Sequence, residues 1–144
     1  MIKKNSKIYI AGHSGLVGSS LLKFFKKNGF SNLIYERSKN LDLRDSKKVN
    51  IFFKKKKIEY MIIAAAKTGG IMSNLTYPTE FFQDNSLIQL NLLSSALRYG
   101  VKRSIFIGSS CIYPCEAKTP IKEEYLLTGK LEETNKAMAI SKIS

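Results

Sequence analysis

Cysteine, arginine, carboxylates and long apolar runs are all scarce in this chain of 144 residues. Its two cysteines, Cys111 and Cys115, are too few for a disulfide framework, so we expect each to be chemically active or incidental. No apolar run approaches the roughly 20 residues that span a bilayer, and no charged-then-apolar leader precedes a cleavage site. We therefore expect a cytoplasmic protein without a membrane partner. The apolar content of 44% excludes a mainly disordered chain.

Acidic residues number 11 against 24 basic ones, which gives a formal net charge of +13. Twenty of the basic residues are Lys and only four are Arg, whereas surfaces that read bases or clamp phosphates favour the bidentate fork of Arg. The longest basic run, residues 54–57, ends a helical stretch, where cations suit the helix dipole. We therefore expect no nucleic-acid partner. The alternative, a basic nucleic-acid binder, predicts salt-sensitive affinity for DNA or RNA.

Short apolar runs alternate with helical patterns along the chain. Strands are predicted at residues 7–11, 33–35, 60–64 and 104–108. Helices are predicted from residue 16 to Asn28-Gly29, from a cap at Ser46 through Phe53, from Pro78 to Tyr99, and from near Thr134. Continuous apolar strands between helices indicate a parallel sheet covered on both faces. The expected fold class is α/β, a Rossmann-type doubly wound parallel sheet truncated after the fourth strand and the start of the next helix.

The chain stops about two turns into that last helix, where natural domains seldom end. We therefore expect residues 1–144 to be an incomplete dinucleotide-binding Rossmann domain, with the C-terminal substrate domain absent.

A glycine loop joins the first predicted strand to the first predicted helix. Gly12, Gly15 and Gly18 meet the three needs of such a loop: a tight turn, close approach of a pyrophosphate, and close packing of helix on strand. The diphosphate then lies on free N–H groups at the positive end of the helix dipole. The residues expected to contact the cofactor here are Gly12, His13, Ser14, Gly15, Leu16, Val17 and Gly18.

The choice of cofactor depends on the residues after the second strand. Arg37 and Lys39 could pair with the 2′-phosphate of NADP, whereas an acidic residue such as Glu36 could bind the ribose hydroxyls of NAD. We favour NADP because two cations flank the site.

Three segments resemble the GDP-L-fucose synthase family, whose members are also called GDP-4-keto-6-deoxymannose epimerase-reductases. They are Gly-Ser-Ser-Cys-Ile-Tyr-Pro at 108–114, Ala-Ala-Ala-Lys-Thr-Gly-Gly-Ile at 64–71, and the segment 121–129. The G-x-x-G-x-x-G spacing is similar to that of the wider superfamily, the extended short-chain dehydrogenases/reductases. The superfamily pattern implies that Asp42, followed by Leu43, faces the adenine and that Ala64, Ala65 and Ala66 line the path of the cofactor. The family is about twice this length, so only its cofactor half is expected here, and its members suggest a homodimer.

The resemblance implies a reaction in which GDP-4-keto-6-deoxy-D-mannose becomes GDP-L-fucose. Cys111 would be the base that inverts C3 and C5, and Ser109 would hydrogen-bond the C4 oxygen. NADPH would then deliver hydride to C4. The alternative for Cys111 is a small buried hydrophobe, which is the commoner role of a cysteine. Its place at the C-terminal end of a predicted strand, after two serines, favours the chemical role.

The chain departs from the family at the Tyr-x-x-x-Lys motif, in which the Lys holds the nicotinamide ribose and the Tyr protonates the new alkoxide. Lys142 is present, but Met138 occupies the usual Tyr position, and a thioether cannot donate a proton. The resemblance also places the family's acid His beyond residue 144, so we expect no epimerase-reductase activity from this chain alone. The alternatives are another NAD(P)-dependent nucleotide-sugar epimerase or dehydratase, or a pseudo-enzyme that only binds the cofactor.

Overall fold

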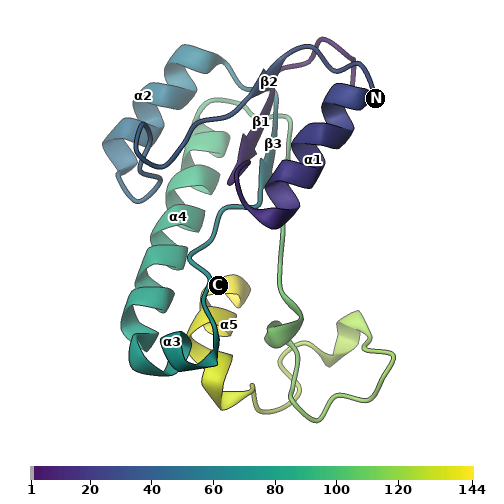
Figure 1. Cartoon of the computed structure of the whole chain (residues 1–144), viewed down its shortest axis with the longest axis vertical. Coiled ribbons are helices and arrows are strands. Elements are labelled where there is room, and N and C mark those ends of the chain that lie inside the picture. The colour runs from purple at the N-terminus through teal and green to yellow at the C-terminus, as the bar shows by residue number, and fades with distance from the viewer. Residues whose placement is uncertain (1) are drawn as a thin grey trace. The chain divides into compact units, whose positions relative to one another are not determined.

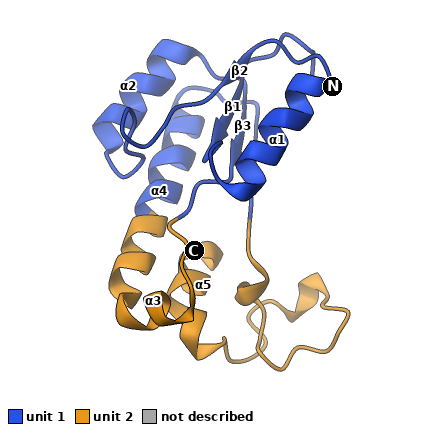
Figure 2. Cartoon of the chain, in the orientation of Figure 1, with its two compact units in different colours: residues 1–66, 87–107 blue, residues 67–86, 108–144 orange. Residues whose placement is uncertain are grey.

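The computed structural model describes residues 2–144, which form two compact units (Figure 2). The first unit contains the residues up to 66 together with residues 87–107, and the second contains residues 67–86 and 108–144. The long helix α4 (Pro78–Arg98) contributes its first part to the second unit and its remainder to the first.

A parallel four-stranded sheet forms the centre of the first unit. Its strands are β1 (Ile8–Ala11), β2 (Leu33–Ile34), β3 (Tyr60–Ile63) and β4 (Arg103–Phe106), in the order β2-β1-β3-β4. All three pairings are parallel, which confirms the predicted sheet. The chain moves from β1 to β2 on one side and then crosses to β3 on the other. The carboxyl ends of β1 and β3 therefore flank a topological switch point, where ligands bind in open α/β sheets.

Helices lie on both faces of this sheet, and its central strands β1 and β3 are almost wholly buried. The expectation of a sheet covered on both faces is wrong for the edge strand β4, which is mostly exposed. Helix α1 (Leu16–Lys27) lies on one face, and α2 (Ser46–Lys56) lies with α4 on the other (Figure 1). Alternate strand residues, such as Tyr9 and Met61, point into the core beneath α2 and α4. That core consists of Tyr9, Ala11, Leu41, Val49, Phe52, Phe53, Ile58, Met61, Ile63, Leu92 and Ala96.

Helices α1 and α4 begin and end within one residue of the prediction, whereas α2 continues three residues past the predicted Phe53, to Lys56. The cap of α2 and the exposed face of α1 also differ from the prediction. Asp45, not Ser46, is the N-cap of α2, and its Oδ1 accepts a hydrogen bond from the backbone N–H of Lys48 at 3.0 Å. The two neighbouring side chains are both good caps, so composition alone does not separate them. Leu16 and Phe24, which follow the helical apolar pattern of α1, are exposed instead of packed on the sheet.

The second unit consists of short helices and loops. Helix α3 (Ile71–Thr76) and the start of α4 belong to it, as do α5 (Lys136–Ile143) and three 3₁₀ turns. The turns are η1 (Ser110–Ile112), η2 (Glu123–Tyr125) and η3 (Glu133–Asn135). Helix α5 packs on η1 and η3, and α3 packs on η3. The helix predicted from near Thr134 thus begins two residues later, after a turn of 3₁₀ helix.

Candidate functional site

The three glycines of the loop in the first unit have different surroundings. Gly12 has a φ of +82°, and a Cβ there would lie 2.6 Å from the backbone nitrogen of Ala65. A Cβ on Gly18 would overlap the carbonyl oxygen of Gly12. Gly15 is different, because a Cβ there would meet only the Gly12 oxygen at 3.5 Å, an ordinary contact. The chain itself therefore requires glycine at 12 and 18, and the third glycine leaves room at the start of α1.

The start of α1 can accept an anion. Gly15 is its N-cap residue, and no side chain in the described part of the chain caps it. The first N–H groups of a helix have no partner within the helix and carry the positive end of its dipole. Ser14, Leu16 and Val17 are exposed around this end. The geometry thus fits the diphosphate of a dinucleotide.

His13 joins the loop to the end of β2. Its ring stacks on that of Tyr35, with 4.8 Å between centroids and 36° between planes. The Nδ1 atom of His13 is buried and has no hydrogen-bond partner among residues 2–144. The ammonium of Lys26 lies 5.5 Å from the Tyr35 ring centroid. A stacked aromatic pair with a nearby cation thus borders the loop on the side where the second strand ends.

The residues that follow Tyr35 present both signs of charge. Arg37 and Lys39 are exposed. Glu36 accepts a hydrogen bond of 3.2 Å from Nδ2 of Asn40, so its carboxylate already has a partner. The arrangement leaves the two cations accessible to a phosphate.

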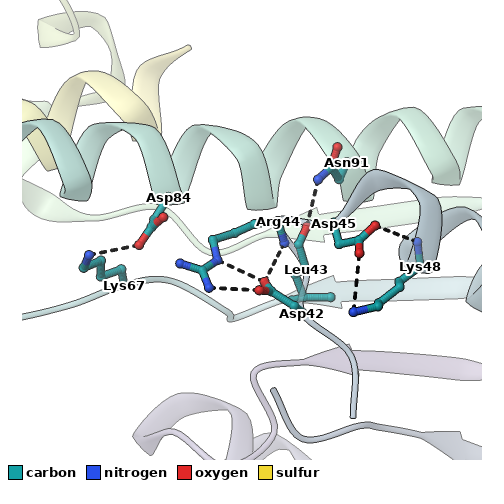
Figure 3. A network of polar contacts seen from close by, with 8 residues as sticks. All are labelled: Asp42, Leu43, Arg44, Asp45, Lys48, Lys67, Asp84 and Asn91. Atoms are coloured by element: carbon teal, nitrogen blue, oxygen red, sulfur yellow. Dashed lines mark hydrogen bonds and ion pairs between the residues drawn. The ribbon is translucent and has the colours of Figure 1, made fainter. Parts of the chain in front are cut away.

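Asp42 and Leu43 are fixed by neighbours within the first unit (Figure 3). The Asp42 carboxylate accepts hydrogen bonds from the Arg44 guanidinium at 2.9 and 3.0 Å and from the Arg44 N–H at 3.0 Å. These bonds lower the pKa of Asp42 to about 2. The carbonyl oxygen of Leu43 accepts a 2.9 Å hydrogen bond from the buried amide of Asn91 on α4. The adenine-facing role of this segment stays a prediction, but its backbone is held in place.

The alanine segment after β3 continues the strand alignment. The Ala64 N–H donates to the carbonyl of Ala11 at 2.9 Å. Ala64, Ala65 and Ala66 are all partly buried. Because even a single Cβ atom on Gly12 would clash with the backbone of Ala64 and Ala65, the loops that follow β1 and β3 lie against each other at the switch point.

The second unit contains the three residues that are predicted to carry the chemistry, Ser109, Cys111 and Lys142. The Ser109 Oγ and Cys111 Sγ atoms lie 2.7 Å apart, and the contact lies at η1. Lys142 belongs to α5, which packs on η1. Burial lowers the pKa of the Lys142 ammonium, and the charge of Cys111 partly opposes that shift. Cys111 is half-buried, whereas Cys115 is exposed.

Met138 lies one helical turn before Lys142, so both side chains project from the same side of α5. Ala139 and Ser141 lie on either side of this pair around the helix and are both buried, and the Ser141 hydroxyl donates to the Met138 carbonyl at 2.6 Å. The helical placement expected of the Tyr-x-x-x-Lys pair is therefore present, with a thioether where the phenol belongs.

Sequence reasoning missed a polar cluster in the second unit (Figure 3). The Lys67 ammonium pairs with the Asp84 carboxylate at 2.9 Å. The buried amide of Asn85 accepts from the Lys67 N–H at 2.7 Å and donates to the Lys67 carbonyl at 3.0 Å. The sequence carries no local signal for this cluster, because Asp84 and Asn85 lie in a polar stretch, residues 83–86, and their partner Lys67 is 17 and 18 positions away.

Among residues 2–144, no cluster of three or more His, Cys, Asp or Glu side chains could hold a metal ion. No described helix combines the length and apolarity needed to cross a bilayer.

Comparison with known proteins agrees with the sequence resemblance. The chain is 48% identical to GDP-L-fucose synthase 1 of Arabidopsis thaliana over 144 residues, which is 100% of this chain and 45% of the plant protein. It is 42% identical to GDP-L-fucose synthase of Escherichia coli (strain K12) over 138 residues, 96% of this chain and 43% of that protein. The chain therefore spans less than half the length of these curated relatives.

A solved structure shares the fold closely. It is MlghC, a GDP-mannoheptose C4 reductase from Campylobacter jejuni with NADP bound, which superposes with a TM-score of 0.95 at 38% identity. The match covers 99% of this chain and 45% of that one. Residues 8–144 match the sequence pattern of the NAD dependent epimerase/dehydratase family, so the chain belongs to that family.

Proposed function

We propose that this chain is the cofactor-binding part of an NADPH-dependent epimerase-reductase that converts GDP-4-keto-6-deoxy-D-mannose to GDP-L-fucose. The observation that carries the proposal is the 2.7 Å contact between Ser109 and Cys111, on a unit that also holds Lys142. A hydroxyl and a thiol in contact suit the removal of a proton next to a ketone. The GDP-L-fucose synthases among the relatives support this substrate class.

Residues of the first unit would hold the cofactor. The open space at Gly15 and the uncapped start of α1 fit a diphosphate. Arg37 and Lys39 would bind a 2′-phosphate, which favours NADP over NAD. The similar reductase with NADP bound supports that choice. Lys142 would hold the ribose next to the nicotinamide, as the family resemblance implies.

The second unit would carry the proton chemistry. The Cys111 thiolate would take the proton from the carbon beside the C4 ketone, and the electron pair of that C–H bond would move to the ketone oxygen. Ser109 would donate a hydrogen bond to the oxygen as it becomes negative. When bound, NADPH supplies the hydride for reduction at C4. The side chain at 138 would then be required to donate the final proton, which Met138 is unable to do.

Met138 favours a second candidate function, binding of the cofactor without reduction. The two differ in the effect of Met138→Tyr, which would restore C4 reduction under the proposal and would not restore it under this alternative. A third possibility is a related GDP-sugar reaction, because the similar Campylobacter jejuni protein is a C4 reductase of GDP-mannoheptose.

A chimera tests the proposal. Residues 1–144 would replace the matching part of the Escherichia coli relative, which supplies the remaining half of a GDP-L-fucose synthase. With Met138, we expect C4 reduction to be slower than with Met138→Tyr by about 10²–10⁴-fold, the usual contribution of general acid catalysis. Deuterium uptake at C3 and C5 should occur with either residue and disappear in Cys111→Ser. The proposal fails if Met138→Tyr restores no reduction and neither chimera exchanges these protons, provided that both bind NADPH.

We also propose that the complete protein is a cytoplasmic homodimer. Helix α4 exposes Leu90, Leu93 and Leu97 at helical spacing, and Leu97 is 87% exposed. The family resemblance places this helix at a dimer contact, and a second copy would cover such an apolar stripe.

A further inference from the structure

Two buried asparagines of α4 hydrogen-bond the backbone of loops that come from elsewhere in the chain. They are Asn85, which belongs to the second unit, and Asn91, which belongs to the first. Neither residue is among those predicted to contact the cofactor. Because a buried amide costs free energy unless its polar atoms are hydrogen-bonded, each asparagine favours one position of the loop that it holds.

Asn85 fixes both backbone groups of Lys67. Its Oδ1 accepts a hydrogen bond from the Lys67 N–H at 2.7 Å, and its Nδ2 donates to the Lys67 carbonyl at 3.0 Å. The Lys67 side chain is held separately, by its 2.9 Å ion pair with Asp84. Further along the same loop, the Nδ2 of buried Asn74 donates to the Gly69 carbonyl at 3.0 Å. This loop is therefore held at several positions within the second unit.

The loop held by Asn85 directly continues the alanine segment that is predicted to line the path of the cofactor. The other end of that segment is fixed in the first unit, where the Ala64 N–H donates to the Ala11 carbonyl at 2.9 Å. Residues 65 and 66 therefore lie between two fixed positions in the chain. A shift of Lys67 would move the residue before it, because the peptide bond that joins them is planar and rigid.

Asn91 holds a different loop. Its Nδ2 donates to the Leu43 carbonyl at 2.9 Å, within the first unit. Leu43 follows Asp42, which is predicted to face the adenine. Arg37 and Lys39, which are predicted to bind the 2′-phosphate of the same half of the cofactor, also belong to the first unit. Asn91 is thus hydrogen-bonded within the set of loops that is predicted to meet the adenosine half.

The nicotinamide side is predicted in the second unit, where Lys142 would hold the neighbouring ribose. We propose that Asn85 and Asn91 are positioning residues for opposite halves of the cofactor. Asn85 sets the loop that meets the nicotinamide half, and Asn91 sets the loop that meets the adenosine half. Each acts through the backbone that it bonds and not through a contact with the cofactor. This role deepens the proposed function and rests on it only in requiring that the chain bind NADPH.

Two ligands separate these roles, since NADPH has both halves and 2′,5′-ADP has only the adenosine half with its 2′-phosphate. Dissociation constants of both would be measured for the 144-residue chain by isothermal titration calorimetry. Asn85→Leu removes both bonds to Lys67, so it should raise the dissociation constant of NADPH by about three- to tenfold and leave that of 2′,5′-ADP unchanged. Asn91→Leu is the matched control on the same helix and should weaken both ligands by the same factor. A general loss of stability would also weaken both ligands alike, so the ratio of the two constants reports positioning alone.

Hydrogen exchange of the unmodified chain tests the same assignment without any variant that must fold. Exchange would be followed by mass spectrometry of peptides, with no ligand, with 2′,5′-ADP and with NADPH. Both ligands should slow exchange in residues 40–46, which include the loop that Asn91 holds. Only NADPH should slow exchange in residues 67–73, which include the loop that Asn85 holds.

The proposal is overturned if the two ligands protect the same peptides, or if Asn85→Leu, still helical by circular dichroism, leaves the ratio of the two dissociation constants unchanged. It is also overturned if Asn91→Leu weakens NADPH but not 2′,5′-ADP, or if the unmodified chain binds NADPH no more tightly than 2′,5′-ADP. Failure of the sugar reaction in the chimera would leave a positive result standing. Absence of NADPH binding would overturn both this role and the proposed function, whereas an unchanged ratio would overturn this role alone.

Discussion

Substituting Gly15 with alanine separates cofactor binding from folding. Gly15 has a φ of −76°, which any residue adopts, and an added Cβ would meet only the Gly12 oxygen at 3.5 Å. Losing glycine at an N-cap costs up to about 1 kcal/mol. Restricting the unfolded chain by Gly→Ala returns about 0.4–1 kcal/mol. The free energy of unfolding of Gly15→Ala should therefore stay within about 1 kcal/mol of that of the unmodified chain.

NADPH affinity should respond very differently. The methyl group would occupy the space through which the diphosphate reaches the N–H groups of α1. A hydrogen bond to a charged group is worth about 1.5–3 kcal/mol, and each 1.4 kcal/mol is tenfold in affinity. Losing one such bond raises the dissociation constant of NADPH by about ten- to a hundredfold. Titration followed by NADPH fluorescence measures this, and urea unfolding followed by circular dichroism measures stability.

Gly18→Ala is the contrasting variant. Its Cβ would overlap the Gly12 carbonyl and lie 2.9 Å from the Cα of His13, so strand and helix must move apart. Overpacking of this kind costs about 1–3 kcal/mol of stability. If Gly15→Ala binds NADPH as tightly as the unmodified chain, the diphosphate does not approach at this position. Equal stability of Gly18→Ala and the unmodified chain would refute the packing argument.

Two further predictions concern a charge pair and a surface. Arg44→Ala should lower the free energy of unfolding at pH 7 by less than about 1 kcal/mol, because both members of the Asp42–Arg44 pair are more than a third exposed. Since Arg44 lowers the pKa of Asp42 to about 2, the pair stabilises the fold above pH 4 and loses this effect as the pH falls toward 2. Urea unfolding at pH 7, 4 and 2 should therefore show that the difference in unfolding free energy between Arg44→Ala and the unmodified chain disappears at low pH. A difference at pH 2 equal to that at pH 7 would contradict this origin. Leu97→Glu should convert a dimer to a monomer, as measured by light scattering, because it places a charge in an apolar stripe that a second copy would cover. The control Lys47→Glu, on the exposed surface of α2, should leave the dimer intact. A Leu97→Glu protein with unchanged molecular mass would exclude α4 as the dimer contact.

The order of the elements was predictable because each strand is a short, continuous apolar run. The sheet that contains Tyr9 and Met61 is parallel and buried, as such runs indicate. Helix α3 was not predicted, since its six residues are too few to show a helical period. The exposure of Leu16 was also missed, because periodicity shows which residues share a face but not whether that face meets the sheet.

The candidate site was also predictable in some parts and not in others. Glycine spacing predicted the loop, and a Cβ at Gly12 or Gly18 would indeed clash with the backbone. The contact of Ser109 with Cys111 is of a kind that a sequence can suggest, because only one residue separates the two. The ion pair of Lys67 with Asp84 spans 17 positions, and no local pattern encodes a partner at that separation.

Helix α4 shows how residues without chemistry of their own support the site. A buried amide costs free energy unless its polar atoms are hydrogen-bonded. Asn91 meets this requirement through the carbonyl of Leu43 in the first unit, and Asn85 does so through both backbone groups of Lys67 in the second. Each amide thus holds a segment that is adjacent in sequence to a residue expected to contact the cofactor, because Leu43 follows Asp42 and Lys67 follows Ala66. Because the backbone groups of these segments would lose their partners if either asparagine were replaced by leucine, the shape of the cofactor site depends on a helix that contributes none of its predicted contacts.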